Sequence, residues 1–131
     1  MKNLTYISIL FLSIITFFGC ETDNYEFGTI TAPSNLEVNY DIVGSDTENP
    51  FGDGDGFVSF TATAANALAY QFSFGDGISQ TNSSGILTHR YTQTGVNSYT
   101  VVVVAVGTAG VLSSTTFDLE VLNTFRDLEL E

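Results

Sequence analysis

Few side chains in this 131-residue chain could carry out chemistry: it has one cysteine, Cys20, one histidine, His89, and 15 Asp and Glu residues. Cys20 has the most informative surroundings, because it follows Gly19 and an apolar and hydroxylic run over residues 4–18, with Lys2 in front of the run. A positive start, an apolar run and a small residue before the cleavage point are typical of a signal peptide. At about 15 residues the run is short of the roughly 20 that a membrane-spanning helix needs.

This N-terminus resembles the lipobox of bacterial lipoproteins, although Phe17 stands where an aliphatic residue is usual. In that family the cysteine becomes the first residue and is acylated, and several acyl chains, at about 0.8 kcal/mol per buried methylene, hold a domain on a membrane. The resemblance implies that residues 1–19 are a lipoprotein signal peptide, that Cys20 is the lipidation site and that residues 20–33 are an acidic tether. The acidic start of the tether resembles the export signal of surface lipoproteins, which implies an outer-membrane, lipid-anchored protein at the cell surface.

The charge of the chain excludes nucleic acid as a partner. Once Lys2 leaves with the signal peptide, only Arg90 and Arg126 remain against the 15 acidic residues. A surface this negative repels phosphate backbones and anionic lipid headgroups. The membrane is therefore expected as a partner only through the lipid, and cations are the small partners that the charge favours.

The acidic, glycine-rich segment over residues 49–56 is the one candidate for metal binding. Asp53 and Asp55 lie two residues apart between glycines, and Asp46 and Glu48 precede them. Carboxylate oxygens on a tightly folded loop are ligands for calcium, but the glutamate that an EF-hand loop needs is missing. The sequence leaves two interpretations open, a calcium site at Asp53 and Asp55 or a hairpin loop, and it predicts no other cofactor.

Asp76 and His89 are expected to be structural. Asp76 lies between Gly75 and Gly77, where its carboxylate can accept main-chain hydrogen bonds and fix a turn. His89 lies beside aromatic residues, and the chain offers no second histidine and no free thiol for a catalytic group. The sequence therefore predicts no catalytic residues.

Period-two alternation of apolar residues predicts the elements that position these side chains. It indicates half-buried strands over residues 36–42, 58–63, 70–74, 86–91, 99–106 and 117–121, with loops at 44–56, 75–85, 93–98 and 107–110. Four valines in a row, residues 101–104, predict a strand that is either covered on both faces or inside a sheet. The pattern favours an all-β sandwich of about seven antiparallel strands over residues 34–122, with 123–131 as a linker or the start of a missing domain.

Two ordered motifs resemble the PKD domain, an immunoglobulin-like β-sandwich of extracellular proteins. Residues 70–77, Tyr-Gln-Phe-Ser-Phe-Gly-Asp-Gly, are similar to its signature, and residues 88–91, Gly95 and 99–101 follow in the order of its second half. The chain departs from the family at Phe72, where tryptophan is usual, at Ser73, where aspartate is usual, and at residues 96–98, which are expected to lengthen the last turn.

The resemblance implies a non-catalytic spacer or interaction module, as in the surface lipoproteins of polysaccharide-uptake systems, with polysaccharide or glycan-uptake proteins as partners. Two alternatives stay open: a direct glycan-binding protein, and an accessory domain of a lipoprotein glycoside hydrolase. Glycan sites rely on exposed aromatic rings, and the few candidates here are Tyr25, Tyr40, Phe51 and Phe125. An enzyme is disfavoured, because a lone sandwich of this size offers little cleft for a pair of carboxylates.

Overall fold

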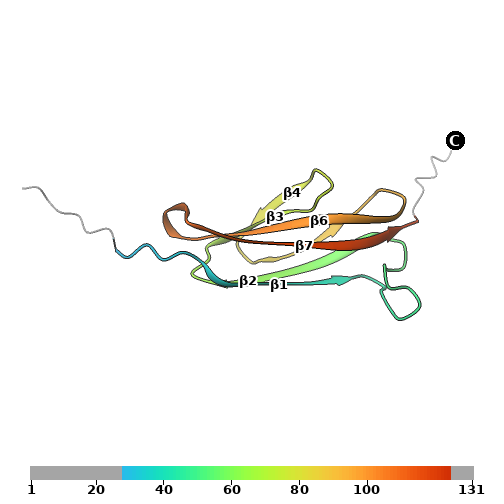
Figure 1. Ribbon diagram of the computed structural model, residues 1–131, viewed down its shortest axis with the longest axis horizontal. Helices are drawn as coiled ribbons and strands as arrows, with labels where there is room; N and C mark the ends of the chain where they lie inside the picture. The colour runs from blue at the N-terminus through green and yellow to red at the C-terminus, as the bar shows by residue number, and fades with distance from the viewer. Residues whose placement is uncertain (1–27, 125–131) are drawn as a thin grey trace, which may run out of the picture.

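Seven strands make up nearly all of the regular structure in the computed structural model, which describes residues 28–124 (Figure 1). The strands are β1 (Ser34–Ile42), β2 (Phe57–Ala65), β3 (Ala69–Ser73), β4 (Ser79–Asn82), β5 (Ile86–Arg90), β6 (Gly95–Val106) and β7 (Leu112–Asn123). A short 3₁₀ turn over Thr108–Gly110 joins β6 to β7. In residues 28–124 no helix is long and apolar enough to cross a membrane.

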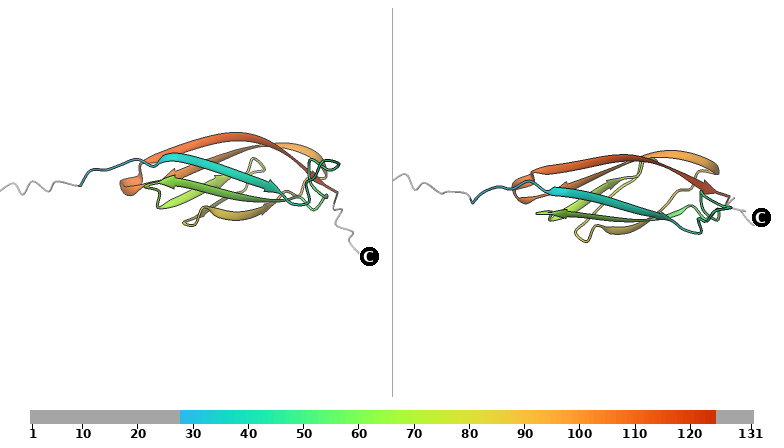
Figure 2. Two further views of the ribbon diagram at one scale, coloured as in Figure 1. Left: turned by 90° about the horizontal axis from the view of Figure 1, so that it is seen from below. Right: turned by 60° about the horizontal axis from the view of Figure 1, so that its bottom comes forward.

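The strands form two antiparallel sheets that face each other. One sheet has the order β1-β2-β5 and the other has the order β4-β3-β6-β7. Figures 1 and 2 show the two layers stacked along a common long axis. The expected all-β sandwich of seven antiparallel strands is therefore confirmed. The predicted lipoprotein signal peptide and Cys20 lie outside the described residues.

The core lies between the sheets and is built from the inner positions of the alternating strands. Phe60 on β2, Phe72 on β3 and Phe74 just after β3 are fully buried, and their rings lie 5.6 to 6.2 Å apart. On β6, which lies next to β3 in the same sheet, Val101 and Val103 are also fully buried. Each such side chain stabilises the fold by about 1.5 to 3 kcal/mol through removal from water. The alternation therefore predicted the inner faces of β2 and β3 correctly.

The valine-rich strand is inside a sheet. β6 pairs with β3 on one side and with β7 on the other. Val101 and Val103 face the core, whereas Val102 and Val104 lie on the outer face and are half-buried. Of the two interpretations left open by the sequence, the interior position in a sheet is confirmed and coverage of both faces is wrong.

Two predicted loops contain strand. β4 falls within residues 75–85, and it escaped detection because its polar sequence Ser-Gln-Thr-Asn, on an edge strand beside β3, buries no apolar face. β6 begins at Gly95, so residues 96–98 extend its pairing with β7 and do not lengthen the turn. Both β4 and the start of β6 pair with a neighbouring strand through main-chain hydrogen bonds. Such pairing leaves no pattern in the side chains, so the sequence did not show it.

The chain enters and leaves the sandwich at opposite ends. Pro33, just before β1, lies against Gly107 at the β6–β7 connection, because a Cβ atom on Gly107 would come within 2.8 Å of Pro33. β7 then runs the full length of the sheet and ends at Asn123 on the far side (Figure 1). A twelve-residue strand is about 40 Å long, at about 3.3 Å per residue.

Candidate functional site

The turn after β3 carries the signature aspartate, and its carboxylate holds both sheets. The Asp76 Oδ1 atom accepts a hydrogen bond from the Ile78 N–H group at 3.0 Å, which closes the turn between β3 and β4. Its Oδ2 atom lies 2.7 Å from Nε2 of His89 on β5, in the other sheet. Although the turn itself is exposed, the side chain of Asp76 is only 17% exposed and that of His89 only 5%. The expected turn-forming role of Asp76 is confirmed, with a second contact that links the sheets.

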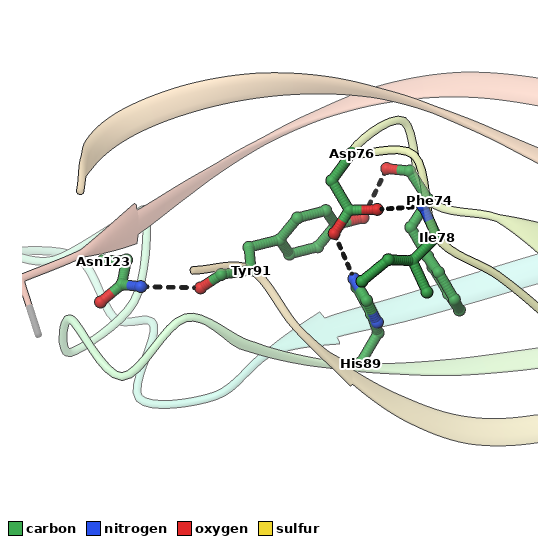
Figure 3. A network of polar contacts seen from close by, with 6 residues as sticks. All are labelled: Phe74, Asp76, Ile78, His89, Tyr91 and Asn123. Atoms are coloured by element: carbon green, nitrogen blue, oxygen red, sulfur yellow. Dashed lines mark hydrogen bonds and ion pairs between the residues drawn. The ribbon is translucent and has the colours of Figure 1, made fainter. Parts of the chain in front are cut away.

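Tyr91 and Asn123 extend this contact into a network (Figure 3). The Tyr91 hydroxyl donates a hydrogen bond to the Phe74 carbonyl oxygen at 3.0 Å, and the Asn123 side-chain amide donates one to the Tyr91 carbonyl oxygen at 2.8 Å. Burial, and then the charge of Asp76, raise the pKa of the Tyr91 hydroxyl above its usual value. The hydroxyl therefore stays protonated and keeps donating. We call Phe74, Asp76, His89, Tyr91 and Asn123 the inter-sheet network.

Aromatic rings enclose the histidine of the inter-sheet network. The Phe74 ring stacks on the His89 imidazole with centroids 3.8 Å apart, and Tyr91 meets it edge-on at 4.8 Å. The imidazole is thus held by one carboxylate and covered by two rings, which gives a reacting group no access to it. The expected structural role of His89 is confirmed. The sequence did not predict its pairing with Asp76, because the two residues lie on different elements and only the fold brings them together.

The acidic loop between β1 and β2 uses its carboxylates to form turns. Oδ1 of Asp46 accepts hydrogen bonds from the main-chain N–H groups of Glu48 and Asn49 at 2.8 and 2.7 Å, and these hydrogen bonds lower the pKa of Asp46. Oδ1 of Asp53 accepts one from the Asp55 N–H group at 3.1 Å. Contacts of this kind are what a hairpin loop requires of aspartate.

Calcium binding at Asp53 and Asp55 stays a prediction. Within residues 28–124, no three His, Cys, Asp or Glu side chains gather closely enough to hold a metal ion. The loop is instead fixed by the protein: the Leu122 and Thr124 N–H groups on and after β7 donate to the Phe51 and Gly54 carbonyl oxygens, both at 2.9 Å. A calcium-dependent rise in melting temperature that Asp53→Asn removes would be the evidence for a site.

Two of the four aromatic glycan-binding candidates lie in one groove. β1 and β7 are edge strands of different sheets, and they run side by side along one flank of the sandwich (Figure 2). A hollow of about 420 Å³ opens there, which we call the seam groove. It is lined by Tyr40, Ile42, Pro50, Phe51 and Leu119 and by the polar residues Ser98, Asp118 and Glu120.

Tyr40 lies on the inner face that the alternation of β1 predicts, with its ring stacked on Phe117, yet 45% of the residue is exposed. β1 is an edge strand, so a side chain that points inward from it also reaches the open flank. Tyr25, Phe125 and the predicted lipidation site Cys20 lie outside the described residues.

Comparison with solved structures shows the fold. The crystal structure of the PKD1 domain from the Vibrio cholerae metalloprotease PrtV is similar over 71% of this chain and 100% of that chain, with 20% identity and a TM-score of 0.53. The described residues fold as a PKD-like domain. The PKD1 domain of Vibrio anguillarum Epp covers 72% of this chain and 99% of its own at 21% identity, with a TM-score of 0.48. Comparisons with protein-family models and with curated proteins give no match.

Proposed function

We propose that this protein is a non-catalytic, lipid-anchored module on the cell surface that acts as a spacer or interaction domain in polysaccharide utilisation. The observation that carries the spacer role is that the chain enters the sandwich before β1 at one end and leaves it after β7 at the other (Figure 1). A domain inserted in this way separates whatever precedes it from whatever follows it by its full length, about 40 Å for strands of this kind.

The sandwich is well suited to hold that separation. β6 and β7 pair over their whole length, from Gly95 with Asn123 to Val106 with Leu112. The end of β7 is held further by the acidic loop and by the buried side chain of Asn123. The end of β7, where the chain leaves the domain, is therefore held by hydrogen bonds to β6, to the acidic loop and to Tyr91.

A non-catalytic role agrees with how the chemically capable residues are used. The single histidine of the chain is enclosed in the inter-sheet network, and the aspartates of the acidic loop form turns. A similar fold occurs as one domain of a Vibrio metalloprotease, PrtV, which is a precedent for such a sandwich as a part of a larger protein.

The membrane anchor of this proposal is Cys20. The lipobox-like N-terminus and the lack of any other cysteine support acylation at this residue. The lipid would attach the tether to the outer membrane, and the acidic residues after Cys20 would direct the protein to the cell surface. Glycan-uptake proteins at that surface are the proposed partners.

Labelling in cells tests the anchor and the location together. The full chain with a C-terminal tag, produced in a Gram-negative bacterium that exports surface lipoproteins, should incorporate a fatty-acid probe, and Cys20→Ala should not. Intact cells should bind an antibody against the tag. Equal labelling of both proteins would contradict lipidation at Cys20, and antibody binding only after the cells are broken would contradict the surface location.

A further inference from the structure

The seam groove joins an exposed aromatic ring to unpaired polar groups. Tyr40 lines it, and Phe117 of β7 stacks on the Tyr40 ring with centroids 5.3 Å apart and planes within 2° of parallel. This contact fixes the ring at the mouth of the groove. The Tyr40 hydroxyl has no hydrogen-bond partner within residues 28–124, so a ligand can use it.

Two further residues that line the groove, Asp118 and Glu120, carry hydrogen-bond acceptors. The Thr100 hydroxyl donates to Oδ1 of Asp118 at 2.6 Å and orients that carboxylate. Glu120 has no side-chain partner within the described part of the chain, and no basic residue lines the groove. Ionised carboxylates only accept hydrogen bonds, so a ligand here must bring O–H or N–H donors. It must also carry no negative charge, because Asp118 and Glu120 would repel it.

The main chain of β7 adds donors and acceptors of its own. The Leu122 N–H group bonds to the acidic loop, away from β6, at 2.9 Å. In an antiparallel pair, the N–H and C=O groups of alternate residues point to the same side. Those of Asp118 and Glu120 therefore also point away from β6, towards the flank where β1 lies. The groove thus offers a ligand both donors and acceptors beside an aromatic face.

We propose that the seam groove binds a carbohydrate that is rich in hydroxyl groups and free of acidic groups. The Tyr40 ring stacks on a sugar ring, while Asp118, Glu120 and Ser98 bond to its hydroxyls. Sugars combine apolar C–H faces with many O–H donors, which matches this combination of an aromatic ring and carboxylates. The volume of about 420 Å³ lies within the usual range for small-ligand sites. This inference gives the proposed function a ligand but does not rest on the lipid anchor.

Affinity electrophoresis of the full chain in mild detergent, with Cys20→Ala so that lipid plays no part, tests the groove. The gels contain a neutral xylan, a neutral mannan, an acidic polygalacturonate or no polysaccharide. We expect retardation by a neutral polysaccharide and none by polygalacturonate. Tyr40→Ala should weaken that binding about tenfold or more, as loss of a central aromatic contact does at other binding sites. Phe57→Ala, which removes a 38% exposed ring elsewhere, should leave binding unchanged.

Glu120→Gln is a second variant that should not disturb folding. Glu120 is exposed and has no side-chain partner in residues 28–124, and glutamine has the same shape as glutamate. The variant should weaken binding to the neutral polysaccharide while the melting temperature stays unchanged. Three outcomes would overturn the proposal: no retardation by either neutral polysaccharide, equal retardation of Tyr40→Ala and Phe57→Ala, or binding of a lysine-rich peptide in place of sugar. Because all proteins in this assay lack Cys20, its result is independent of the labelling experiment for the anchor.

Discussion

The carboxylate of Asp76 bonds in two directions, to the turn that it starts and to a histidine on the opposite sheet. Without it, the His89 side chain would be enclosed by rings with an unpaired nitrogen. A buried polar group left without its partner costs about 1 to 3 kcal/mol.

Asp76→Ala should therefore lower the free energy of unfolding by about 1.5 to 3 kcal/mol, since the lost partner is charged. Urea unfolding followed by circular dichroism measures this change. Asp41→Ala is the matched control, because the Asp41 side chain is exposed on β1 and has no hydrogen bond within residues 28–124, so the change should shift the stability by no more than about 0.5 kcal/mol. Equal unfolding midpoints for the two variants would show that the contact between the sheets contributes nothing.

Tyr91 makes the inter-sheet network sensitive to alkali. Burial, and then Asp76, raise the pKa of its hydroxyl in the folded state, and burial also raises that of Tyr99. A tyrosine whose pKa is higher when folded gives stability that is complete below its unfolded pKa of about 10 and is lost as the pH rises above it. The wild type should therefore lose stability steeply above about pH 10.

Tyr91→Phe separates the two contributions of this hydroxyl. At neutral pH the variant should be less stable by about 0.5 to 1.5 kcal/mol, because the hydrogen bond to the Phe74 carbonyl is lost. Above about pH 10 it should lose less further stability than the wild type does, although Tyr99 keeps some dependence. Urea midpoints over a pH series give both values, and parallel pH curves for the two proteins would contradict the role of Tyr91.

At the scale of elements, the turn between β3 and β4 has two glycines that differ in the space available for a side chain. Gly75 and Gly77 have φ angles of 83° and 90°, which both favour glycine. A Cβ atom on Gly75 would lie 2.6 Å from the Thr100 carbonyl oxygen of β6, whereas one on Gly77 would meet nothing within 4 Å. The turn can thus change at Gly77 without moving β6, but not at Gly75.

Gly75→Ala should consequently destabilise the domain by about 1 to 3 kcal/mol more than Gly77→Ala, the difference being the displacement of main chain. Both variants place a side chain at a positive φ angle and are destabilised equally by it. Each variant therefore serves as the control for the other. Thermal unfolding of the pair is the measurement. Similar melting temperatures would mean that β3 and β6 can separate at this point without penalty.

The assignment of inner and outer faces on β2 and β3 gives a second prediction at the scale of elements. Phe72 is fully buried, while Phe57, at the start of β2, is 38% exposed and has the Arg90 guanidinium 5.4 Å from its ring. Phe72→Ala should cost about 3 to 5 kcal/mol, a large part of the stability of a domain of this size. Phe57→Ala should cost much less in the same urea titration, and a reversed order would mean that the inner and outer faces are assigned wrongly.

At the scale of the whole sandwich, residues 28–124 form an elongated domain that the chain enters at one end and leaves at the other (Figure 1). A rigid spacer can be tested with spin labels on cysteines introduced at Ser34 and Thr124 in the Cys20→Ala chain. The labels should give one narrow distance distribution at about 40 Å, the length of a twelve-residue strand. The distance should not change when the seam groove is altered by Glu120→Gln. A broad or much shorter distribution would contradict a rigid spacer.

The sequence by itself determined the class of fold and the inner faces. Alternation marked Phe60, Phe72 and Leu119 as core residues, and glycines around Asp76 marked a turn, because the side-chain period of a strand and the positive φ of a turn are local properties. It also determined the net negative charge, from which we expect no phosphate-rich partner whatever the fold.

Only the tertiary structure decided which strands are edges and which distant residues meet. Alternation shows which face of a strand is buried, but the same pattern fits a central strand or an edge strand, so the exposure of Tyr40 had to wait for the sheet order β1-β2-β5. β4, whose four polar residues bury no apolar face, likewise left no apolar signal. The contact of Asp76 with His89, and the seam groove between Tyr40 and Glu120, join residues on opposite sheets, and their positions depend on how the two layers pack together.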